Sequence, residues 1–483
     1  MALKFDLIVV SGGRLAAAVM AMMSIHAVTT FLTPEQYGEL SILITVQMFC
    51  GLFLLNPVGQ HINLHTHAWW DDGTLMVRLK SYRNYVLTVS LVGGMTVLSI
   101  DKNHSQEQLL WTSVAMFAMV SAGTWNSTFI PMLNMLGFRT ASVLLTIITV
   151  AIGLTASIFL VAWLPSATAW FAGQSIGMLI GGLGANYVLR RKAVLSKHSL
   201  ISLPLLNRST IRNYCLPLAI ATGFMWLQLG GYRFLIERYW GLAQLGFLTM
   251  GLQLAGQIWG LAESLAMQFL YPLFYRRVSA YEKLEEVELA FSDLLNTLLP
   301  VYFVLTGLLV LGAPYLLKIL VGPRFQDSIS FVMLGAAIEL LRVLGNLLSN
   351  AAHVRRKTMA LALPYALGST IVLIILYFAG ASQLKIGWAG AGLLAGATAM
   401  FIAMLVGMYK QVKFVLDSER CLIAAAVMFA MVILGFWMPS VSGLAESIGV
   451  LMLEGTLAAI AMLALLWKNP ATLRLVNVKL ANQ

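Results

Sequence analysis

The stretch FLTPEQYGELS (Phe31–Ser41) has a partial echo in YWGLAQLGFLT (Tyr239–Thr249). Both copies contain the pattern Gln-x-Gly-x-Leu, which starts at Gln36 in the first copy and at Gln244 in the second. Each copy lies between two long apolar runs, so each is expected to mark a turn between two helices. The repeated turn predicts that the chain contains an internal duplication.

The composition predicts a membrane protein. Hydrophobic residues make up 59% of the chain, charged residues 11%, and the mean hydropathy is +0.83. The apolar runs approach the roughly 20 residues that a helix needs to cross about 30 Å of hydrocarbon. We therefore expect an all-α polytopic membrane protein with about fourteen transmembrane helices, the first retained rather than cleaved as a signal peptide. The predicted spans are 7–32, 38–59, 84–100, 109–131, 140–164, 168–189, 214–235, 244–272, 290–312, 328–351, 359–381, 387–408, 420–440 and 444–467.

The distribution of Lys and Arg predicts the orientation. With both termini in the cytoplasm, most of the 31 Lys and Arg residues fall in cytoplasmic segments, as the positive-inside rule requires. The few in outside loops are Lys102, Arg238, Lys318, Arg324 and Lys385. The net charge of +11 is scattered over short loops, which favours contact with anionic lipid over nucleic acid. We expect a multi-pass protein of the bacterial inner membrane.

A second echo supports the duplication. LNMLGFRTA after the fourth predicted span and SNAAHVRRKT after the tenth match Asn134 with Asn350 and Arg139 with Arg355. Because an even number of spans separates the copies, the two halves should be parallel repeats, which are typical of transporters that rock about a central cavity. The expected organisation is a lobe of spans one to six (1–210), a lobe of spans seven to twelve (211–415), and spans thirteen and fourteen with a cytoplasmic tail (416–483).

Two stretches resemble a known family. FLTPEQYGELSILITVQMFCGLFLLNPVGQHI is similar to the opening spans of the Wzx-type oligosaccharide flippases, the polysaccharide-transport branch of the multidrug/oligosaccharidyl-lipid/polysaccharide exporter superfamily. Leu320–Thr358 resembles the same family's region around its tenth span. The resemblance implies that the protein flips an undecaprenyl-diphosphate-linked oligosaccharide from the cytoplasmic to the periplasmic leaflet by alternating access, for O-antigen, lipopolysaccharide or exopolysaccharide synthesis. The implied partners are the lipid-linked oligosaccharide, membrane lipids and other polysaccharide assembly proteins.

Arginines within the spans are candidates for binding the diphosphate. A charged side chain at mid-membrane costs about 2.5–3.5 kcal/mol, so such residues normally face a cavity or a partner. Arg14 lies early in the first span and Arg233 near the outer end of the seventh, and the planar arginine fork binds phosphate oxygens in pairs. Two structural alternatives stay open: Arg14 extending to the headgroups, and Arg233 paired with Glu237 one turn later.

Polar faces on spans eight and ten are candidates for binding sugar. Glu339, Arg342 and Asn346 share one face of span ten. Gln253 and Gln257 share one face of span eight, and amides both donate to and accept from hydroxyl groups. The alternatives are a self-neutralising Glu339–Arg342 pair and interhelical hydrogen bonds by the glutamines.

Energy coupling has three candidate residues. The sequence has no Gly-x-x-x-x-Gly-Lys loop for ATP, so transport would draw on an ion gradient, the membrane potential or removal of product. Glu263, Glu339 and His26 are the candidate proton or ion carriers, and Glu263 ranks first because it lies beside the polar face of span eight. We predict no cofactor and no metal site. The cysteines have no metal-ligand spacing, and although His61 and His65 are one helical turn apart, their segment adjoins a Trp-Trp pair and is expected to be a membrane-surface helix.

Two other function classes compete with the flippase hypothesis. A cation-coupled multidrug exporter of the same superfamily would need an acidic cavity for cationic drugs, whereas the candidate residues here are mixed in charge and lean basic. A polytopic membrane glycosyltransferase or polymerase would need a large external loop with catalytic groups. The predicted loops are short, so we expect a transporter and no enzyme.

Overall fold

The computed structural model describes residues 2–100, 105–193, 208–280, 284–355, 357–437 and 443–477, and the regular structure within these ranges is helical. Each predicted span lies on described helix over most of its length. Among the described residues, nine helical stretches are long and apolar enough to cross a membrane. The predicted all-α polytopic membrane class is confirmed.

The chain forms two compact units, Met1–Glu237 and Arg238–Gln483. The division falls after the predicted seventh span rather than before it, because α8 packs against α3 and η1 of the first unit. The lobes predicted from the repeat, 1–210, 211–415 and 416–483, stay a prediction about duplication.

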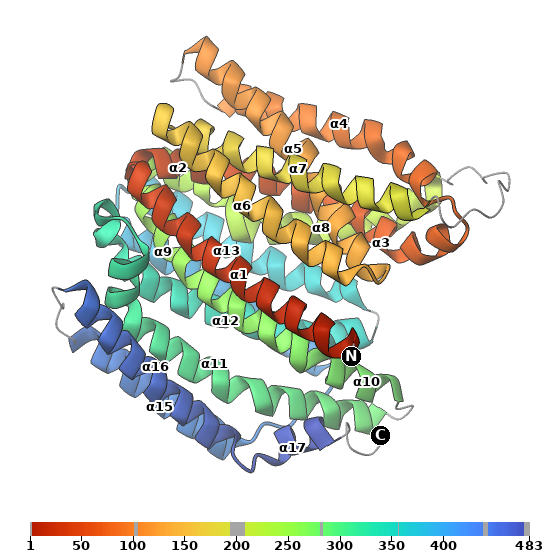
Figure 1. Cartoon of the computed structure of the whole chain (residues 1–483). Helices are drawn as coiled ribbons and strands as arrows, with labels where there is room; N and C mark the ends of the chain where they lie inside the picture. Colours follow the sequence, from red (N-terminus) through yellow and green to blue (C-terminus); the bar gives the residue numbers. More distant parts are fainter. Residues whose placement is uncertain are drawn as a thin grey trace. The chain divides into compact units, whose positions relative to one another are not determined.

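The first unit consists of the helices from α1 to the start of α9 (Figure 1). They are α1 (Ala2–Phe31), α2 (Pro34–Met48), the π-helical η1 (Phe49–Leu55), α3 (Asn56–Asp71), α4 (Leu75–Ile100), α5 (Gln106–Met135), α6 (Arg139–Trp163), α7 (Ala167–Ala193), α8 (Arg208–Trp226), the π-helical η3 (Leu227–Gly231) and the start of α9 (Arg233–Phe269). Helix α7 packs against both α5 and α6, and α1 packs along α6. Gly177 permits the close approach of α7 to α6, because a Cβ there would collide with the Thr149 carbonyl.

Both copies of the repeated turn mark breaks in helices. In the first copy, Thr33 caps α2 through a capping box with Gln36, and Pro34 occupies the first turn, where a missing N–H has no cost. The Gln36 amide also donates to the Pro165 carbonyl at 2.7 Å. In the second copy, Gly241 interrupts α9 with a φ of 83°, a left-handed conformation that glycine adopts without strain.

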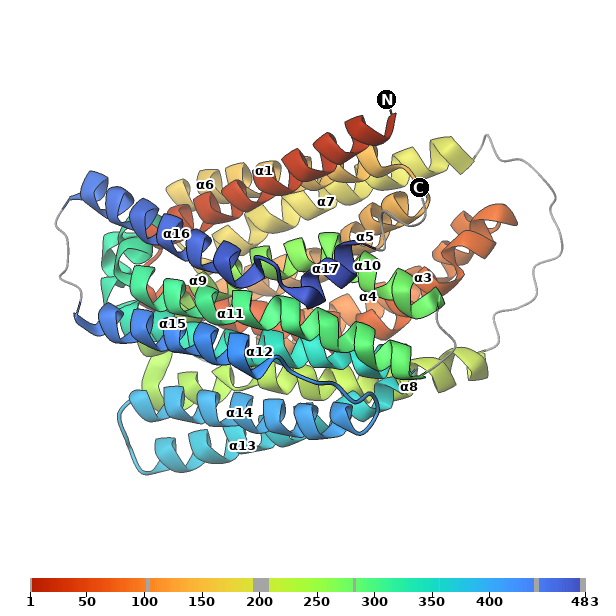
Figure 2. The ribbon, with the colours of Figure 1, turned by 90° about the horizontal axis from the view of Figure 1, so that it is seen from below.

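The second unit is arranged around α11. Its elements are the remainder of α9, α10 (Tyr271–Ala280), α11 (Leu284–Leu320), η4 (Pro323–Ser328), α12 (Ile329–Val354), η5 (Thr358–Leu361), α13 (Ala362–Ala381), α14 (Gly387–Tyr409), α15 (Ser418–Trp437), α16 (Leu444–Leu466) and α17 (Pro470–Asn477). Helix α11 packs against α10, α12, α15, α16 and α17, and α13 lies beside α14 (Figure 2). Its apolar core includes the fully buried Trp259, Tyr302 and Phe291.

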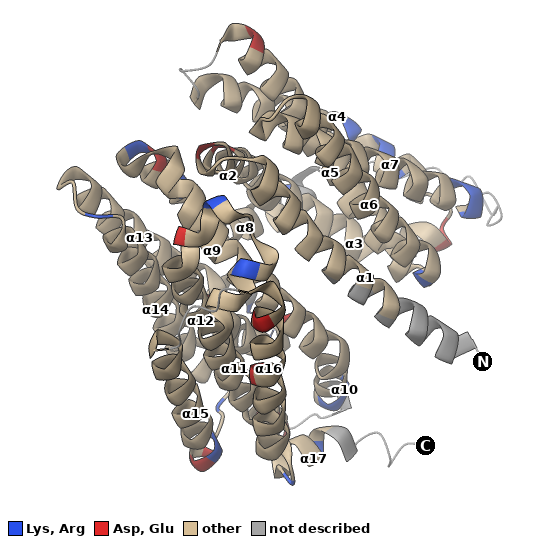
Figure 3. Ribbon diagram, turned by 60° about the vertical axis from the view of Figure 1, so that its left-hand side comes forward, with Lys and Arg blue, Asp and Glu red and all other residues tan. Residues whose placement is uncertain are grey.

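The surface of the helices suits a hydrocarbon solvent. Large apolar side chains on α15 and α16 are well exposed, including Phe436, Met452 and Leu453. Lys, Arg, Asp and Glu occur mainly toward helix ends, and the middles of most helices carry none (Figure 3). This distribution agrees with helices that cross a bilayer, because apolar side chains can face lipid while charges stay near the headgroups.

Candidate functional site

A close crossing of α9 and α12 brings the two polar helix faces together. A Cβ at Gly251 of α9 would lie 2.5 Å from the Cβ of Phe331. A Cβ at Gly335 of α12 would lie 2.9 Å from the Cβ of Ala255. Small residues at such a crossing let two backbones approach closely, so that polar side chains can reach from one helix to the other.

The resulting ionic cluster joins Glu263 of α9 to three residues of α12, and we call it the α9–α12 cluster. Arg342 donates from Nε to Glu339 Oε2 at 2.6 Å and from Nη2 to Glu263 Oε2 at 2.7 Å. Asn346 donates from Nδ2 to the other oxygen of Glu263 at 2.9 Å. Four residues selected from the sequence therefore lie in one hydrogen-bonded group, with Glu263 and Glu339 sharing a single guanidinium.

The α9–α12 cluster contains more carboxylates than guanidiniums. With both carboxylates ionised and one arginine, the group carries one excess negative charge. Its side chains are partly open, at 24% exposure for Arg342, 20% for Glu263 and 17% for Glu339.

The α9–α12 cluster includes the Glu339–Arg342 pair that was the structural alternative for span ten. The Glu339–Arg342 pair within one helix does form. Glu339 is not the sole partner of Arg342 among the described residues, however, because Glu263 from α9 binds the same guanidinium. The sequence showed the spacing along each helix but carried no signal for which helix would supply the second carboxylate.

The candidate glutamines lie on α9, N-terminal to Glu263. Gln253 is exposed and Gln257 is partly buried. They precede Glu263 on the same continuous helix, as their predicted span required. Their proposed contact with sugar hydroxyls stays a prediction.

Arg233 is held by α2 within the first unit. Its Nη1 donates to the Ser41 carbonyl at 3.3 Å and to Thr45 Oγ1 at 3.4 Å. Its guanidinium lies 5.9 Å from the ring centroid of Tyr232. The acceptors on α2 could not be foreseen, since Ser41 and Thr45 are ordinary small polar residues of an apolar span.

The two remaining candidates are on α1. His26 is exposed there. The side chain of Arg14 lies outside the described residues, so its predicted role and its alternative both stay predictions.

A second ionic cluster was missed from the sequence. Asp293 of α11 is fully buried and accepts from Arg277 Nη1 of α10 at 2.7 Å. Arg474 of α17 donates to Asp293 Oδ1 from Nη2 at 2.6 Å and from Nε at 3.0 Å. We call these three residues the Asp293 cluster. Its signal was a single aspartate within an otherwise apolar run, the kind of residue that the cost of burying a charge singles out.

Comparisons with known proteins identify the fold. No protein-family model matches the sequence, and no curated protein matches it significantly. Among solved structures, the lipid II flippase MurJ in an inward closed conformation aligns with a TM-score of 0.66 and 11% identity over 95% of this chain and 98% of its own. An inward-facing multidrug resistance MATE transporter of the MOP superfamily aligns with a TM-score of 0.58 and 13% identity over 86% of this chain and 95% of its own.

The chain has the fold of these two proteins. An outward-facing MATE transporter aligns less closely, with a TM-score of 0.50 and 15% identity over 88% of this chain and 96% of its own. The likeness extends over nearly the whole length of each neighbour.

Proposed function

We propose that the protein is a flippase that moves an undecaprenyl-diphosphate-linked oligosaccharide from the cytoplasmic to the periplasmic leaflet of the bacterial inner membrane, for surface polysaccharide synthesis. The observation that carries this proposal is the likeness to MurJ, a lipid II flippase, over 95% of the chain. The Wzx-like sequence stretches point to the same class of cargo. The neighbours named above are transporters, which supports a non-enzymatic role.

In this proposal, arginines bind the diphosphate. The buried Nε of Arg233 has no hydrogen-bond partner in the described part of the chain. A buried donor left without an acceptor is costly, and a phosphate oxygen would satisfy it with a strong charge-assisted bond. Arg14 is proposed to act in the same way earlier in the transport path, at the end of α1 that is predicted to be cytoplasmic.

The α9–α12 cluster is proposed to couple transport to an ion. Its excess carboxylate provides a site for one proton or one small cation, with Glu263 and Glu339 as the groups that bind it. Neutralisation would weaken the hold of Glu263 on Arg342 and so change how α9 and α12 are joined. His26 is a second proposed proton carrier. Arg342, Asn346, Gln253 and Gln257 are proposed to contact sugar hydroxyls.

A multidrug exporter is the second candidate function. Two observations favour it: the MATE-like fold and the excess negative charge of the α9–α12 cluster, which suits a cationic drug. The flippase hypothesis assigns cargo contact to Arg342 and Asn346 of this cluster, whereas the exporter hypothesis assigns it to the carboxylates Glu263 and Glu339.

One experiment separates the two candidates. Lipid-linked oligosaccharides are measured by mass spectrometry, surface polysaccharide by staining and drug tolerance by growth, in cells lacking the gene and in cells complemented with it. The flippase proposal expects that the surface polymer disappears and that a completed undecaprenyl-linked unit accumulates, and that complementation restores both. Unchanged polymer and intermediates with lowered drug tolerance would overturn the flippase proposal and favour the exporter.

A further inference from the structure

A pocket in the first unit is lined by residues that the candidate site does not include. Helices α4, α5 and α7 enclose a volume of about 620 Å³, within the roughly 300–1,000 Å³ typical of small-molecule sites. Its depth depends on short side chains, because Ala122 of α5 and Gly182 of α7 form part of the lining. The pocket is open to the surface of the unit.

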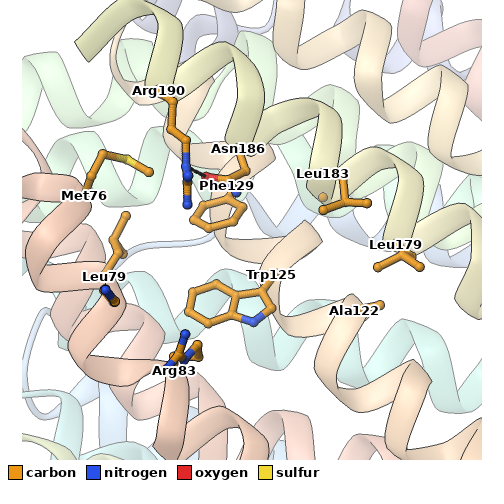
Figure 4. Close-up of a pocket in the computed structure, with 12 residues that line it drawn as sticks. Met76, Leu79, Arg83, Ala122, Trp125, Phe129, Leu179, Leu183, Asn186 and Arg190 are labelled. Carbon is orange, nitrogen blue, oxygen red and sulfur yellow. Dashed lines mark hydrogen bonds between the residues drawn. The ribbon is translucent and has the colours of Figure 1, made fainter. Parts of the chain in front are cut away.

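The pocket attracts anions. Lys80 and Arg83 of α4 and Arg190 of α7 line it, and its lining contains no Asp or Glu. Lys80 and Arg83 are three residues apart and so share a face of α4. Arg190 projects toward the same space from the opposite side (Figure 4), with its Nε donating to Asn186 Oδ1 at 3.1 Å. Three cations converge where no carboxylate in the lining neutralises them.

The remainder of the lining is apolar and aromatic. Trp125 and Phe129 of α5 stack with their centroids 5.2 Å apart and their planes at 20°, and both rings face the pocket (Figure 4). Leu179 and Leu183 are one turn apart on α7 and are 49% and 58% exposed. Arg190 follows Leu183 by about two turns. The pocket therefore has a cationic end, and an apolar stripe runs away from that end along α7.

This arrangement matches the two parts of an anionic lipid. The cations lie near helix ends, where the last turn of α7 also contains Arg191 and Lys192, so they belong at headgroup depth rather than in hydrocarbon. A phosphate contacts them favourably, and basic pockets between transmembrane helices are known to take lipid headgroups. The exposed leucines then lie at the depth of the acyl chains.

We propose that the α4–α5–α7 pocket is a binding site for an anionic glycerophospholipid of the surrounding membrane. Its phosphate binds Lys80, Arg83 and Arg190, and one acyl chain packs on Trp125 and along Leu179 and Leu183. The lining of this pocket includes no residue of the α9–α12 cluster, and the proposal does not depend on the proposed function.

The test uses Trp125 as a local reporter. The purified full-length protein is titrated in detergent with phosphatidylglycerol brominated on its acyl chains, and the quenching due to Trp125 is taken as the difference between the wild type and Trp125→Phe. Brominated phosphatidylcholine provides the neutral-lipid comparison. The pocket variant is Lys80→Gln/Arg83→Gln/Arg190→Gln. The matched control, Arg324→Gln/Lys385→Gln/Lys410→Gln, removes equal charge at exposed positions of the second unit.

We expect Trp125 to be quenched by brominated phosphatidylglycerol at lower concentration than by phosphatidylcholine. The pocket variant should weaken this binding by about tenfold or more, since each Lys or Arg contributes substantially to attraction of anionic lipid, and the control variant should not. Equal quenching by both lipids, or equal loss in the two charge variants, overturns the proposal. So does displacement of phosphatidylglycerol by a lower concentration of undecaprenyl diphosphate, which would assign the pocket to a prenyl-diphosphate lipid instead.

Thermal unfolding of the pocket variant supplies the fold control. If its midpoint is lowered, the single variants Lys80→Gln and Arg83→Gln replace it, because both residues are exposed on α4 and their truncation leaves no buried group unpaired. Each should then weaken phosphatidylglycerol binding with an unchanged midpoint. A single variant that folds normally and binds like the wild type overturns the role of that cation.

Discussion

The two ionic clusters of the Arg238–Gln483 unit use the same residue types in opposite proportions. In the α9–α12 cluster two carboxylates share one guanidinium, and the side chains are 17–24% exposed. In the Asp293 cluster one fully buried carboxylate receives two guanidiniums, from Arg277 at 7% exposure and Arg474 at 48%. A fully buried carboxylate held by two arginines suits a structural joint, whereas the partly exposed cluster with excess negative charge is the one that we propose to exchange a proton or a cation.

The two clusters also differ in the number of elements that they join. The Asp293 cluster ties α10, α11 and α17 together, and nearby Asn296 adds hydrogen bonds to the Val415 carbonyl at 2.9 Å and from the Asp417 amide at 2.8 Å. The α9–α12 cluster joins only two helices through side chains alone. The first should therefore govern stability, and the second should govern transport.

The largest expected effect is the loss of stability in Asp293→Asn. Removing this charge breaks the ion pair between Asp293 and the buried Arg277, and breaking a buried ion pair costs about 3–5 kcal/mol. Thermal unfolding of the purified protein in detergent should show a strongly lowered midpoint. The control is Glu285→Gln, an exposed glutamate in the first turn of the same helix. Equal midpoints for the two variants would remove the distinction between the clusters.

The second prediction concerns Glu263→Gln, which should abolish most transport and leave the unfolding midpoint near that of the wild type. The variant retains a neutral Glu339–Arg342 pair, and glutamine can still accept a hydrogen bond from Asn346. Transport should fall about tenfold or more, within the about 5–150-fold range of a typical coupling energy, as measured by restoration of surface polysaccharide.

The control for this variant is Glu446→Gln, an exposed glutamate that caps α16 by accepting from the Gly443 amide at 3.2 Å. Glutamine preserves that acceptor. Full transport by Glu263→Gln would refute the ion-coupling role of the α9–α12 cluster. A lowered midpoint for Glu263→Gln would instead make it structural, like the Asp293 cluster.

A smaller effect is expected for Arg474→Ala. The Arg474 side chain is about half exposed, so water already weakens its ion pair with Asp293. Loss of this pair should lower the free energy of unfolding by about 1 kcal/mol, as for exposed ion pairs. Unfolding midpoints at low and high salt would measure this, and the difference from the wild type should shrink at high salt. A loss as large as that of Asp293→Asn would mean that Arg474, rather than Arg277, is the main partner.

The smallest effect is expected for Glu454→Gln on α16. Both carboxylate oxygens of Glu454 are buried and have no hydrogen-bond partner among the described residues. An amide of the same shape avoids burying a charge, so the unfolding midpoint should stay the same or rise slightly. A clear fall would show that Glu454, although it has no guanidinium beside it, belongs with the structural carboxylate Asp293.

Much of the fold could be predicted from the sequence, because hydropathy acts locally. Apolar runs of spanning length gave the helices, and the repeated Gln-x-Gly-x-Leu turn correctly marked the break at Thr33 and the kink at Gly241. Boundaries between units were harder to predict. Helix α8 belongs with the first unit because of what it packs against, and packing partners leave no mark on hydropathy.

The candidate site was predictable along each helix but not between helices. Spacing placed Glu339, Arg342 and Asn346 on one face, and their proximity to each other followed from the helical period. The contact of Glu263 with that face required the crossing at Gly251 and Gly335. Asp293 was missed because its two arginines come from α10 and from α17, which is remote in the chain.

The sequence by itself determined that this protein is a helical membrane protein, because water and lipid sort side chains by hydropathy wherever they occur. The choice of charge partners was decided only by the tertiary structure. Glu263 meets Arg342, and Asp293 meets Arg277 and Arg474, because helix packing fixes which faces touch and at what height. In a medium that cannot solvate ions, that choice determines which charges are permanently paired and which are available to bind and release an ion.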